Sequence, residues 1–143
     1  MITRTITFLA LAALASIALP MSYAQNPALH RVSRIHVAAM GSGEQADRFH
    51  SLLREELSKI GFEVAEQRAN ADAVLAGSFQ YEAGGELTSA RATVTLRPQN
   101  GKQILWSGDY ISQHKGQGHE DVIRNLAETC AQQLRKSWEK SAP

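Results

Sequence analysis

Histidine and acidic side chains near the carboxyl end of the chain have the types and the spacing that could hold a metal ion. His114 and His119 are separated by four residues, and Glu120 and Asp121 follow directly. A zinc site needs three or four such ligands in one place, whereas the glycines between the two histidines indicate an exposed loop. We therefore assign no metal site, and keep a small-ligand or metal-binding periplasmic protein that uses His114 and His119 as the alternative interpretation.

Arrangements for nucleophilic or phosphate chemistry are incomplete. Gly77-Ser78 lacks the following glycine and the strand-to-helix turn of a nucleophile elbow. Gly41-Ser42-Gly43 precedes a predicted helix, but without the third glycine or the lysine of the phosphate-binding patterns. The doublets Glu55-Glu56 and Glu120-Asp121 point in different directions on a helix, and we expect them to be solvated. The sequence predicts no enzyme and no cofactor, and a small hydrolase is the least favoured interpretation.

The single cysteine excludes an intramolecular disulfide. Cys130 falls on the apolar side of a predicted helix, and free cysteine behaves there as a small hydrophobic residue. We expect a buried thiol rather than a reactive nucleophile.

Hydrophobic periodicity predicts five strands and two helices in the order β-α-β-β-β-β-α. The predicted strands are Arg34–Met40, Phe62–Glu66, Ala73–Tyr81, Leu87–Arg97 and Lys102–Ser112. The first predicted helix starts at a capping box of Ser42 and Gln45, has an apolar stripe from Ala46 to Ile60 and ends before Gly61; the second runs from His119 to Glu139. The strand–helix–strand unit at the start implies a parallel pair, and the run Ala73–Tyr81 is typical of a strand buried on both faces. The expected fold class is α/β (α+β), a mixed five-stranded sheet with both helices packed on one face.

The uncovered face of that sheet is the remaining candidate site. Arg91 and Arg97 fall on the polar side of an alternating strand, and Trp106 and Tyr110 share one side of the last strand. Periodicity leaves the side of Trp106 open. If it faces outward, the four residues form the mix of aromatic residues and arginine that is enriched at interfaces; if it faces inward, Trp106 and Tyr110 belong to the core. We take Arg91, Arg97, Trp106 and Tyr110 as candidate partner-binding residues.

The amino terminus has the pattern of a cleavable signal peptide, residues 1–24. Arg4 precedes an uncharged run of 14 residues, Ile6–Leu19, and the small-x-small sequence Ser22-Tyr23-Ala24 follows. That run is shorter than the roughly 20 residues of a membrane-spanning helix, and no cysteine follows it for lipidation. We expect cleavage after Ala24, a periplasmic or secreted product with no stable membrane anchor, a flexible leader at 25–32, and a single domain at 33–140.

Charge excludes nucleic acid as the expected partner. The full chain has 15 basic and 14 acidic residues, and cleavage removes only Arg4, which leaves 14 of each sign. Binding to nucleic acid depends on clustered cations, and Arg135-Lys136 is the only adjacent basic pair.

Two stretches carry a resemblance to a family of envelope modules. They are Ala71-Asp72-Ala73-Val74-Leu75-Ala76-Gly77-Ser78 and Leu96-Arg97, Asn100-Gly101-Lys102, Leu105-Trp106-Ser107-Gly108. They are similar to the amino-terminal domain of TolB proteins and to the CsgG-like periplasmic domain, over residues 33 to 138. The resemblance implies a small non-catalytic domain used for protein–protein contact, and it transfers no functional residue. The sequence thus predicts an exported, non-catalytic envelope protein, a protein-interaction or assembly module with an envelope protein as partner.

Overall fold

A computed structural model describes residues 26–115 and 119–142, of which 119–121 are described by their backbone only. The predicted signal peptide lies outside the described residues. Within them, no helix combines the length and the hydropathy needed to cross a bilayer.

The strands form one mixed sheet in the order β2-β1-β3-β4-β5. β1 (Arg34–Val37) pairs in parallel with β2 (Glu63–Val64) and with β3 (Ala73–Gly84). The three long strands β3, β4 (Leu87–Pro98) and β5 (Trp106–Lys115) are antiparallel to one another. The predicted fold class and element order are therefore confirmed.

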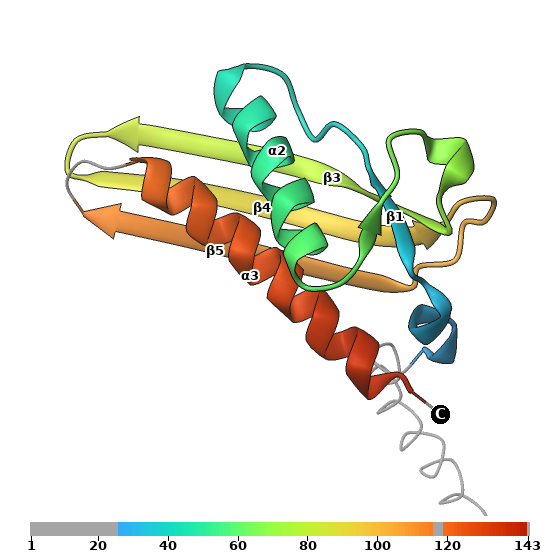
Figure 1. The fold of residues 1–143 in the computed structure, drawn as a ribbon. Coiled ribbons are helices and arrows are strands. Elements are labelled where there is room, and N and C mark those ends of the chain that lie inside the picture. Colours follow the sequence, from blue (N-terminus) through green and yellow to red (C-terminus); the bar gives the residue numbers. More distant parts are fainter. Residues whose placement is uncertain (1–25, 116–118, 143) are drawn as a thin grey trace, which may run out of the picture.

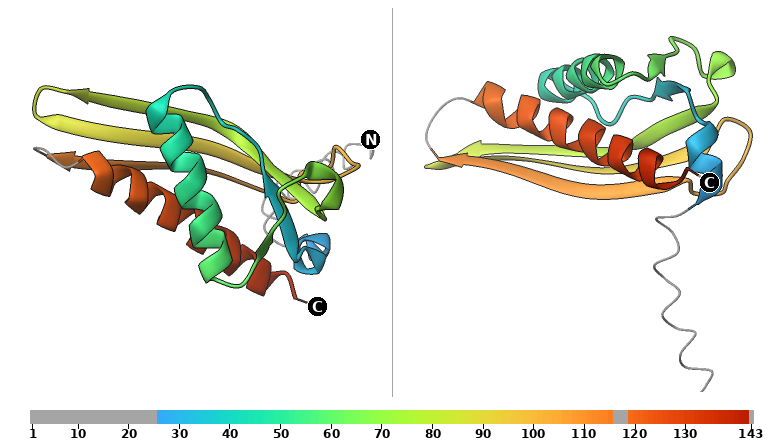
Figure 2. Two further views of the ribbon diagram at one scale, coloured as in Figure 1. Left: turned by 45° about the horizontal axis from the view of Figure 1, so that its top comes forward. Right: turned by 60° about the horizontal axis from the view of Figure 1, so that its bottom comes forward.

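Both helices cover the same face of the sheet, as predicted. α2 (Glu44–Lys59) and α3 (His119–Lys140) lie side by side in front of the strands in Figure 1, and the second view of Figure 2 shows them on one side only. Their apolar stripes are fully buried against the sheet, and the largest of these side chains are Phe49, Leu53, Leu57, Val122, Ile123, Leu126 and Leu134. Each contributes roughly 2 kcal/mol by leaving water.

An ion-pair group lies between the two helices. Lys59 Nζ is 3.3 Å from Glu55 and 3.2 Å from Glu56, and Arg124 Nη1 on α3 is 3.9 Å from both carboxylates. Glu56 is only 7% exposed, so the expectation of a solvated doublet is wrong for Glu56. The reason is its place at the border of the apolar stripe of α2, where α3 packs against it. The same contacts raise the pKa of Lys59, first through its hydrogen bond with Glu56.

Residues 26–32 are not the loose leader that the sequence predicts. Pro27–Arg31 forms a 3₁₀ turn, η3, whose first backbone N–H groups are capped by Asn26. Leu29 is 1% exposed and belongs to the core. Trp138 of α3 donates its indole N–H to the carbonyl oxygen of Val32 (2.8 Å). This segment is polar in composition, and only the distant α3 gives its one leucine a place to be buried.

Three local predictions also differ from the structure. α2 begins after Gly43, which has φ 107° and offers no side chain, so the predicted capping box of Ser42 and Gln45 is absent. β5 begins at Trp106 instead of Lys102 and extends to Lys115. β3 is buried on both faces only at Ala73–Leu75, the residues that pair with β1, and its remaining residues are partly or fully exposed.

The motif residues at the start of β3 have structural roles. One oxygen of Asp72, Oδ2, accepts hydrogen bonds from the backbone N–H groups of Ser33 and Arg34 (both 2.9 Å), which ties β1 to the entry of β3. These bonds, first that of the Ser33 N–H, lower the pKa of Asp72. Gly77 lies so close to β4 that a Cβ there would collide with the carbonyl oxygen of Thr93. Asp72 and Gly77, which belong to the stretch that carries the family resemblance, therefore stabilise the packing of β3 against its neighbouring strands.

Candidate functional site

Alternation along the three long strands produces one uncovered face. Directly paired residues of antiparallel strands point to the same side of a sheet, and the register pairs outward-pointing residues in rows across β3, β4 and β5. We define the open face by these side chains: Ala76, Ser78, Gln80 and Glu82 of β3; Leu87, Ser89, Arg91, Thr93, Thr95 and Arg97 of β4; Ser107, Asp109, Ile111, Gln113 and Lys115 of β5.

An ion pair lies at the centre of the open face. Arg91 Nε and Nη2 donate to the two carboxylate oxygens of Asp109 at 3.0 and 2.7 Å, and the Thr93 hydroxyl lies 3.3 Å from the same carboxylate. The two-bond contact lowers the pKa of Asp109 and raises the pKa of Arg91. Both side chains are half exposed, so this ion pair orients the guanidinium more than it stabilises the fold.

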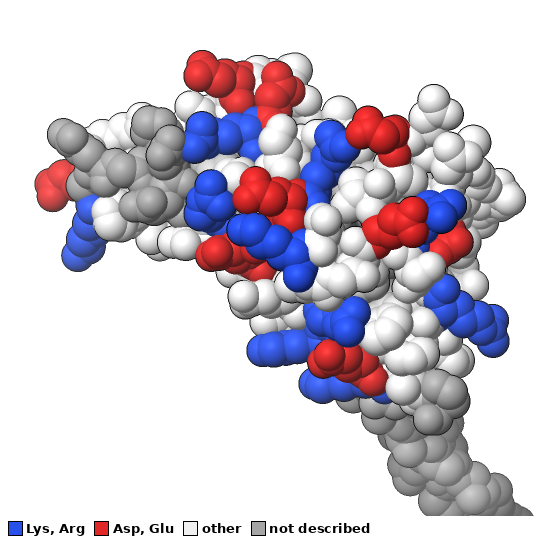
Figure 3. Space-filling view, in the orientation of Figure 1, with Lys and Arg blue, Asp and Glu red and all other residues white. Residues whose placement is uncertain are grey.

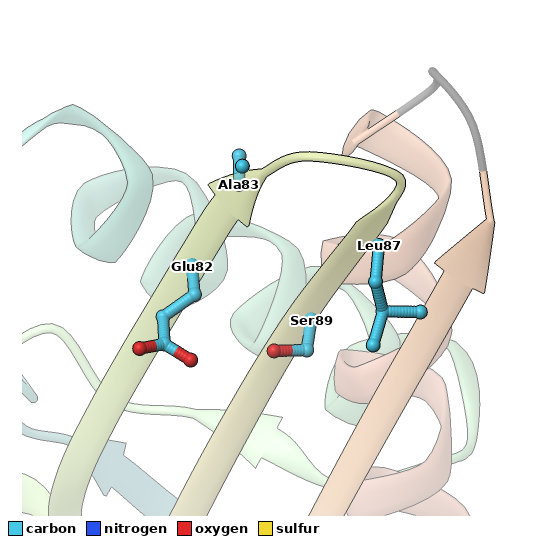
Figure 4. A pocket seen from close by; sticks show the side chains of 5 residues that line it. Glu82, Ala83, Leu87 and Ser89 are labelled. Atoms are coloured by element: carbon cyan, nitrogen blue, oxygen red, sulfur yellow. The ribbon is translucent and has the colours of Figure 1, made fainter.

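Shallow hollows lie along the open face between Arg91 and the β3–β4 turn. One of about 490 Å³ lies over Gln80, Glu82, Ser89, Arg91 and Ile111, with Tyr81 at its side. A second of about 610 Å³ continues toward the β3–β4 turn, where Glu82 and Ser89 lie on adjacent strands and Leu87 points toward β5 (Figure 4).

Two large apolar side chains of the open face remain exposed. Ile111 is 57% exposed and Leu87 is 43% exposed. A broad, shallow surface of hydroxyl, amide and charged side chains with two exposed apolar residues suits contact with another macromolecule better than enclosure of a small molecule.

The four predicted partner-binding residues do not share a face. Arg91 and Arg97 lie on the open face, and Arg97 Nε donates to the carbonyl oxygen of Lys102 (3.4 Å). Trp106 is 8% exposed and is paired with the buried Leu96, so it faces the helices. Tyr110 is on the same side, with its ring stacked 6.4 Å from that of Trp106. Of the two alternatives left open by the sequence, the core placement is the one found.

Tyr110 lies on the side of the sheet that α3 covers, and Cys130 of α3 influences it electrostatically. The Tyr110 ring passes over Gly108, whose missing side chain leaves room for it, and its hydroxyl would lie 2.6 Å from a Cβ at that position. Burial raises the pKa of Tyr110 and raises the pKa of the Cys130 thiol to about 12. Cys130 is 2% exposed and belongs to the core, as predicted. Because the thiolate is the nucleophilic form, the raised pKa also opposes reaction of this thiol.

Three histidines are hydrogen-bonded to backbone carbonyl groups. His30 Nδ1 donates to Trp138 O at 2.9 Å, His36 Nδ1 to Ala65 O at 3.0 Å, and His50 Nε2 to Val37 O at 2.8 Å. A carbonyl oxygen only accepts, so each of these ring nitrogens donates its N–H and ties two segments of the fold together. Their roles are structural.

The predicted metal alternative gains no further ligand in the described part of the chain. His114 is an exposed residue of β5 rather than a loop residue, and its register partner is Thr88. His119 begins α3, and its side chain, like those of Glu120 and Asp121, lies outside the described residues. Among the residues that are described, no group of three or more histidine, cysteine or acidic side chains comes together.

Sequence reasoning identified the arginines of the open face but missed Asp109 and Ile111. Alternation along the last strand places Asp109 on the same face as Ile111, two residues further on. Its position opposite Thr93 is known only from the structure. Finding its contact with Arg91 required the register of the β4–β5 hairpin, which a single sequence does not give, and β5 begins at Trp106 instead of the predicted Lys102.

The sequence matches no protein-family model and no curated protein. The fold is similar to PelC from Paraburkholderia phytofirmans, solved as a dodecamer, with a TM-score of 0.57 at 20% identity over 73% of this chain and 88% of PelC. A minor lipoprotein from Acinetobacter baumannii gives 0.56 at 15% identity over 79% of this chain and 98% of that one. A lipoprotein from Neisseria meningitidis gives 0.52 at 15% over 73% and 99%. At such identities the likeness establishes the fold alone. Neither TolB nor CsgG is among these neighbours, so that resemblance stays a prediction.

Proposed function

We propose that this protein is an exported, non-catalytic envelope protein that binds another protein through the open face of its sheet. The observation that carries the proposal is the unequal treatment of the two faces of β3, β4 and β5. One face buries a continuous core under two helices, and the other leaves Arg91 fixed by Asp109 beside the exposed Ile111. A fixed arginine next to exposed apolar surface costs little conformational entropy when a partner binds.

The composition of the face favours protein over other partners. Its charges are mixed in sign, as they are on the helix side in Figure 3. Mixed charge gives a polyanion such as nucleic acid no continuous track of cations. Aligned short side chains on a broad sheet give a flat surface that a protein segment can cover.

The neighbouring folds support an envelope role. Two of them are described as bacterial lipoproteins, and PelC is described as a dodecamer. In this chain the segment 1–24 has the signal-peptide pattern, so we propose export to the periplasm with Gln25 as the first residue of the mature protein. Amino-terminal sequencing of the periplasmic protein checks this; a periplasmic product that retains residues 1–24 would contradict it.

Site-specific photocrosslinking in cells tests the open face. A photoreactive residue replaces Thr93, which is exposed at the centre of the open face, and a matched one replaces Thr129, which is exposed on α3. We expect a discrete adduct to another protein from position 93 and none from position 129. The adduct from position 93 should disappear when Arg91 and Arg97 are both replaced by glutamate.

A second pair of charge reversals is the control for that loss. Lys136→Glu with Lys140→Glu reverses two exposed charges on α3, away from the open face, and should leave the adduct unchanged. Equal adducts from positions 93 and 129, or an adduct that survives the arginine reversals, would count against the open face as the binding surface.

A further inference from the structure

The two edges of the sheet are built differently. At one edge β2 has two residues, Glu63 and Val64, which is too short to template another strand. At the other edge β5 has ten residues, Trp106–Lys115, and no strand beyond it in the described part of the chain. An edge of that length presents a row of backbone donors and acceptors to any strand that can approach.

The hydrogen-bond pattern identifies which groups of β5 are free. Phe79 N donates to Met40 O, and Leu75 O accepts from Ala38 N. The odd-numbered residues of β3 therefore direct their backbone N–H and C=O groups toward β1. The even-numbered residues of β3 therefore bond to β4, and the register carries the alternation across β4 to β5. It follows that Asp109, Ile111, Gln113 and Lys115 direct their N–H and C=O groups toward the free edge.

The usual protection of an edge strand is concentrated at the start of β5. Leu96 is paired with Trp106, and its carbonyl oxygen also accepts a hydrogen bond from Leu105 N. Two residues, Leu105 and Trp106, therefore lie opposite one, which is a local β-bulge. From Asp109 to Lys115 the strand has no proline and no bulge, and Ile111 is 57% exposed. The seven residues Asp109–Lys115 are thus the part of the edge open to pairing.

The sequence of this stretch is complementary to itself. Its two formal charges, Asp109 and Lys115, are opposite in sign and lie three residues on either side of Ser112. A two-fold axis through Ser112 would place each Asp109 opposite Lys115 of a second copy, and each Ile111 opposite Gln113. Opposite charges directly across a strand pair stabilise it, whereas like charges destabilise it.

We propose that β5 pairs antiparallel with β5 of a second copy of this chain, with the two-fold axis at Ser112, which joins two five-stranded sheets into one. The free groups of Asp109, Ile111, Gln113 and Lys115 in the two copies would form about eight backbone hydrogen bonds. A two-fold axis perpendicular to the sheet keeps both helical layers on one side and joins the two open faces into one surface. The proposal concerns the edge of β5, so it holds or fails independently of what the open face binds.

Cysteine crosslinking tests the register directly. Ser112 pairs with itself in a non-hydrogen-bonded position, where Cα atoms are about 4.5 Å apart, within the range of a disulfide. We expect mature S112C to form a disulfide-linked dimer under mild oxidation, and S107C, placed before the paired stretch on the same strand, to form no disulfide link between copies. The native Cys130 is buried and does not compete. A crosslink through I111C without one through S112C would overturn the proposed register.

Backbone and charge variants test the edge without a cysteine. Sedimentation of the wild-type mature chain should give a dimer, and Ile111→Pro, which removes an outward N–H and leaves the β4–β5 bonds in place, should raise the dimer dissociation constant at least tenfold. Lys115→Glu, which sets one like charge opposite each Asp109, should weaken the dimer several-fold. Lys102→Glu, an exposed reversal outside the strand, should not.

If Ile111→Pro fails to fold, Lys115→Glu and S112C still test the proposal, because they change only side chains. A wild-type chain that stays monomeric at millimolar concentration and gives no S112C crosslink overturns the proposal. So does a dimer that is indifferent to both Ile111→Pro and Lys115→Glu, since its interface then lies elsewhere.

Discussion

The covered and open faces of β4 come from the same twelve residues and obey different constraints. On the covered face Ala90, Ala92, Val94 and Leu96 are all between 0 and 1% exposed. On the open face their immediate neighbours are hydroxyl and arginine side chains in contact with water. Burial dictates residue type on the covered face, whereas it places no such restriction on the open face. The comparison teaches that the fold can be explained from the covered face, and under the proposed function binding belongs to the open face.

Adjacent residues of β4 give the largest expected contrast. Leu96→Ala removes a fully buried side chain from the covered face and should lower the free energy of unfolding by about 2–5 kcal/mol. Thr95→Ala, one residue away on the open face, should change it by less than about 0.5 kcal/mol. Urea unfolding followed by circular dichroism measures both. Similar losses for the two variants would show that the open face also supports the fold.

Two glycines of β3 sharpen the comparison along a single strand. In Gly77→Ala the new Cβ meets the Thr93 carbonyl and lies 2.9 Å from Val94 Cα, so β3 and β4 must separate. We expect a loss of about 1–3 kcal/mol, the usual cost of overpacking. At Gly84 nothing lies within 4 Å of a Cβ, and Gly84→Ala should be neutral or slightly stabilising. The midpoint of thermal unfolding should fall in Gly77→Ala and should stay the same or rise slightly in Gly84→Ala.

The covered face is also the part of the molecule that the sequence predicts well. Hydrophobic residues at helical spacing place α2 and α3, and strict alternation places β4, because burial imposes a period on the sequence. The single-sided arrangement of the helices follows from the polar side of β4. These features depend on residue type at regular intervals, which a single sequence contains.

What the sequence could not predict depends on contacts between distant segments. Both sides of β5 are partly apolar, so only α3 packing over Trp106 decides its face. The order of η3 requires the carboxyl-terminal Trp138, more than one hundred residues away. At the start of α2, a serine and a glutamine at capping-box spacing are overruled by the positive φ of Gly43. The candidate site shifted for the same reason, since Asp109 meets Arg91 only in the actual register.

Two aspartates test whether a carboxylate matters more at a strand junction or on the open face. Asp72→Ala removes hydrogen bonds to two backbone N–H groups and, allowing for solvent exposure, should cost about 1 kcal/mol of stability. Asp109→Ala breaks only a solvent-exposed ion pair with Arg91 and should cost less. Chemical unfolding at pH 7 ranks the two, and an equal or larger loss for Asp109→Ala would reverse the comparison.

The contribution of Asp72 should also depend on pH in a defined direction. Its pKa is lowered in the folded state by the N–H groups of Ser33 and Arg34, so its stabilisation is present above the unfolded pKa, about 3.9, and is lost as the pH falls through the folded pKa. The stability difference between wild type and Asp72→Ala should therefore be constant from pH 7 to 5 and shrink below pH 4. A difference that stays constant to pH 2 would assign the effect to geometry instead of charge.

Thiol reactivity gives the smallest perturbation and the most direct reading of the two faces. Burial raises the pKa of Cys130 to about 12, so at pH 8 the folded protein should react with a thiol reagent such as DTNB only when it unfolds. Thr93→Cys in a Cys130→Ala background places a thiol on the exposed open face, where it should react as fast as a free cysteine.

Because the raised pKa favours the neutral thiol, Cys130 stabilises the fold below its unfolded pKa and this contribution falls as the pH rises toward 12. Rapid labelling of Cys130 under native conditions would mean that α3 leaves the sheet readily, and the covered face would then be a second accessible surface.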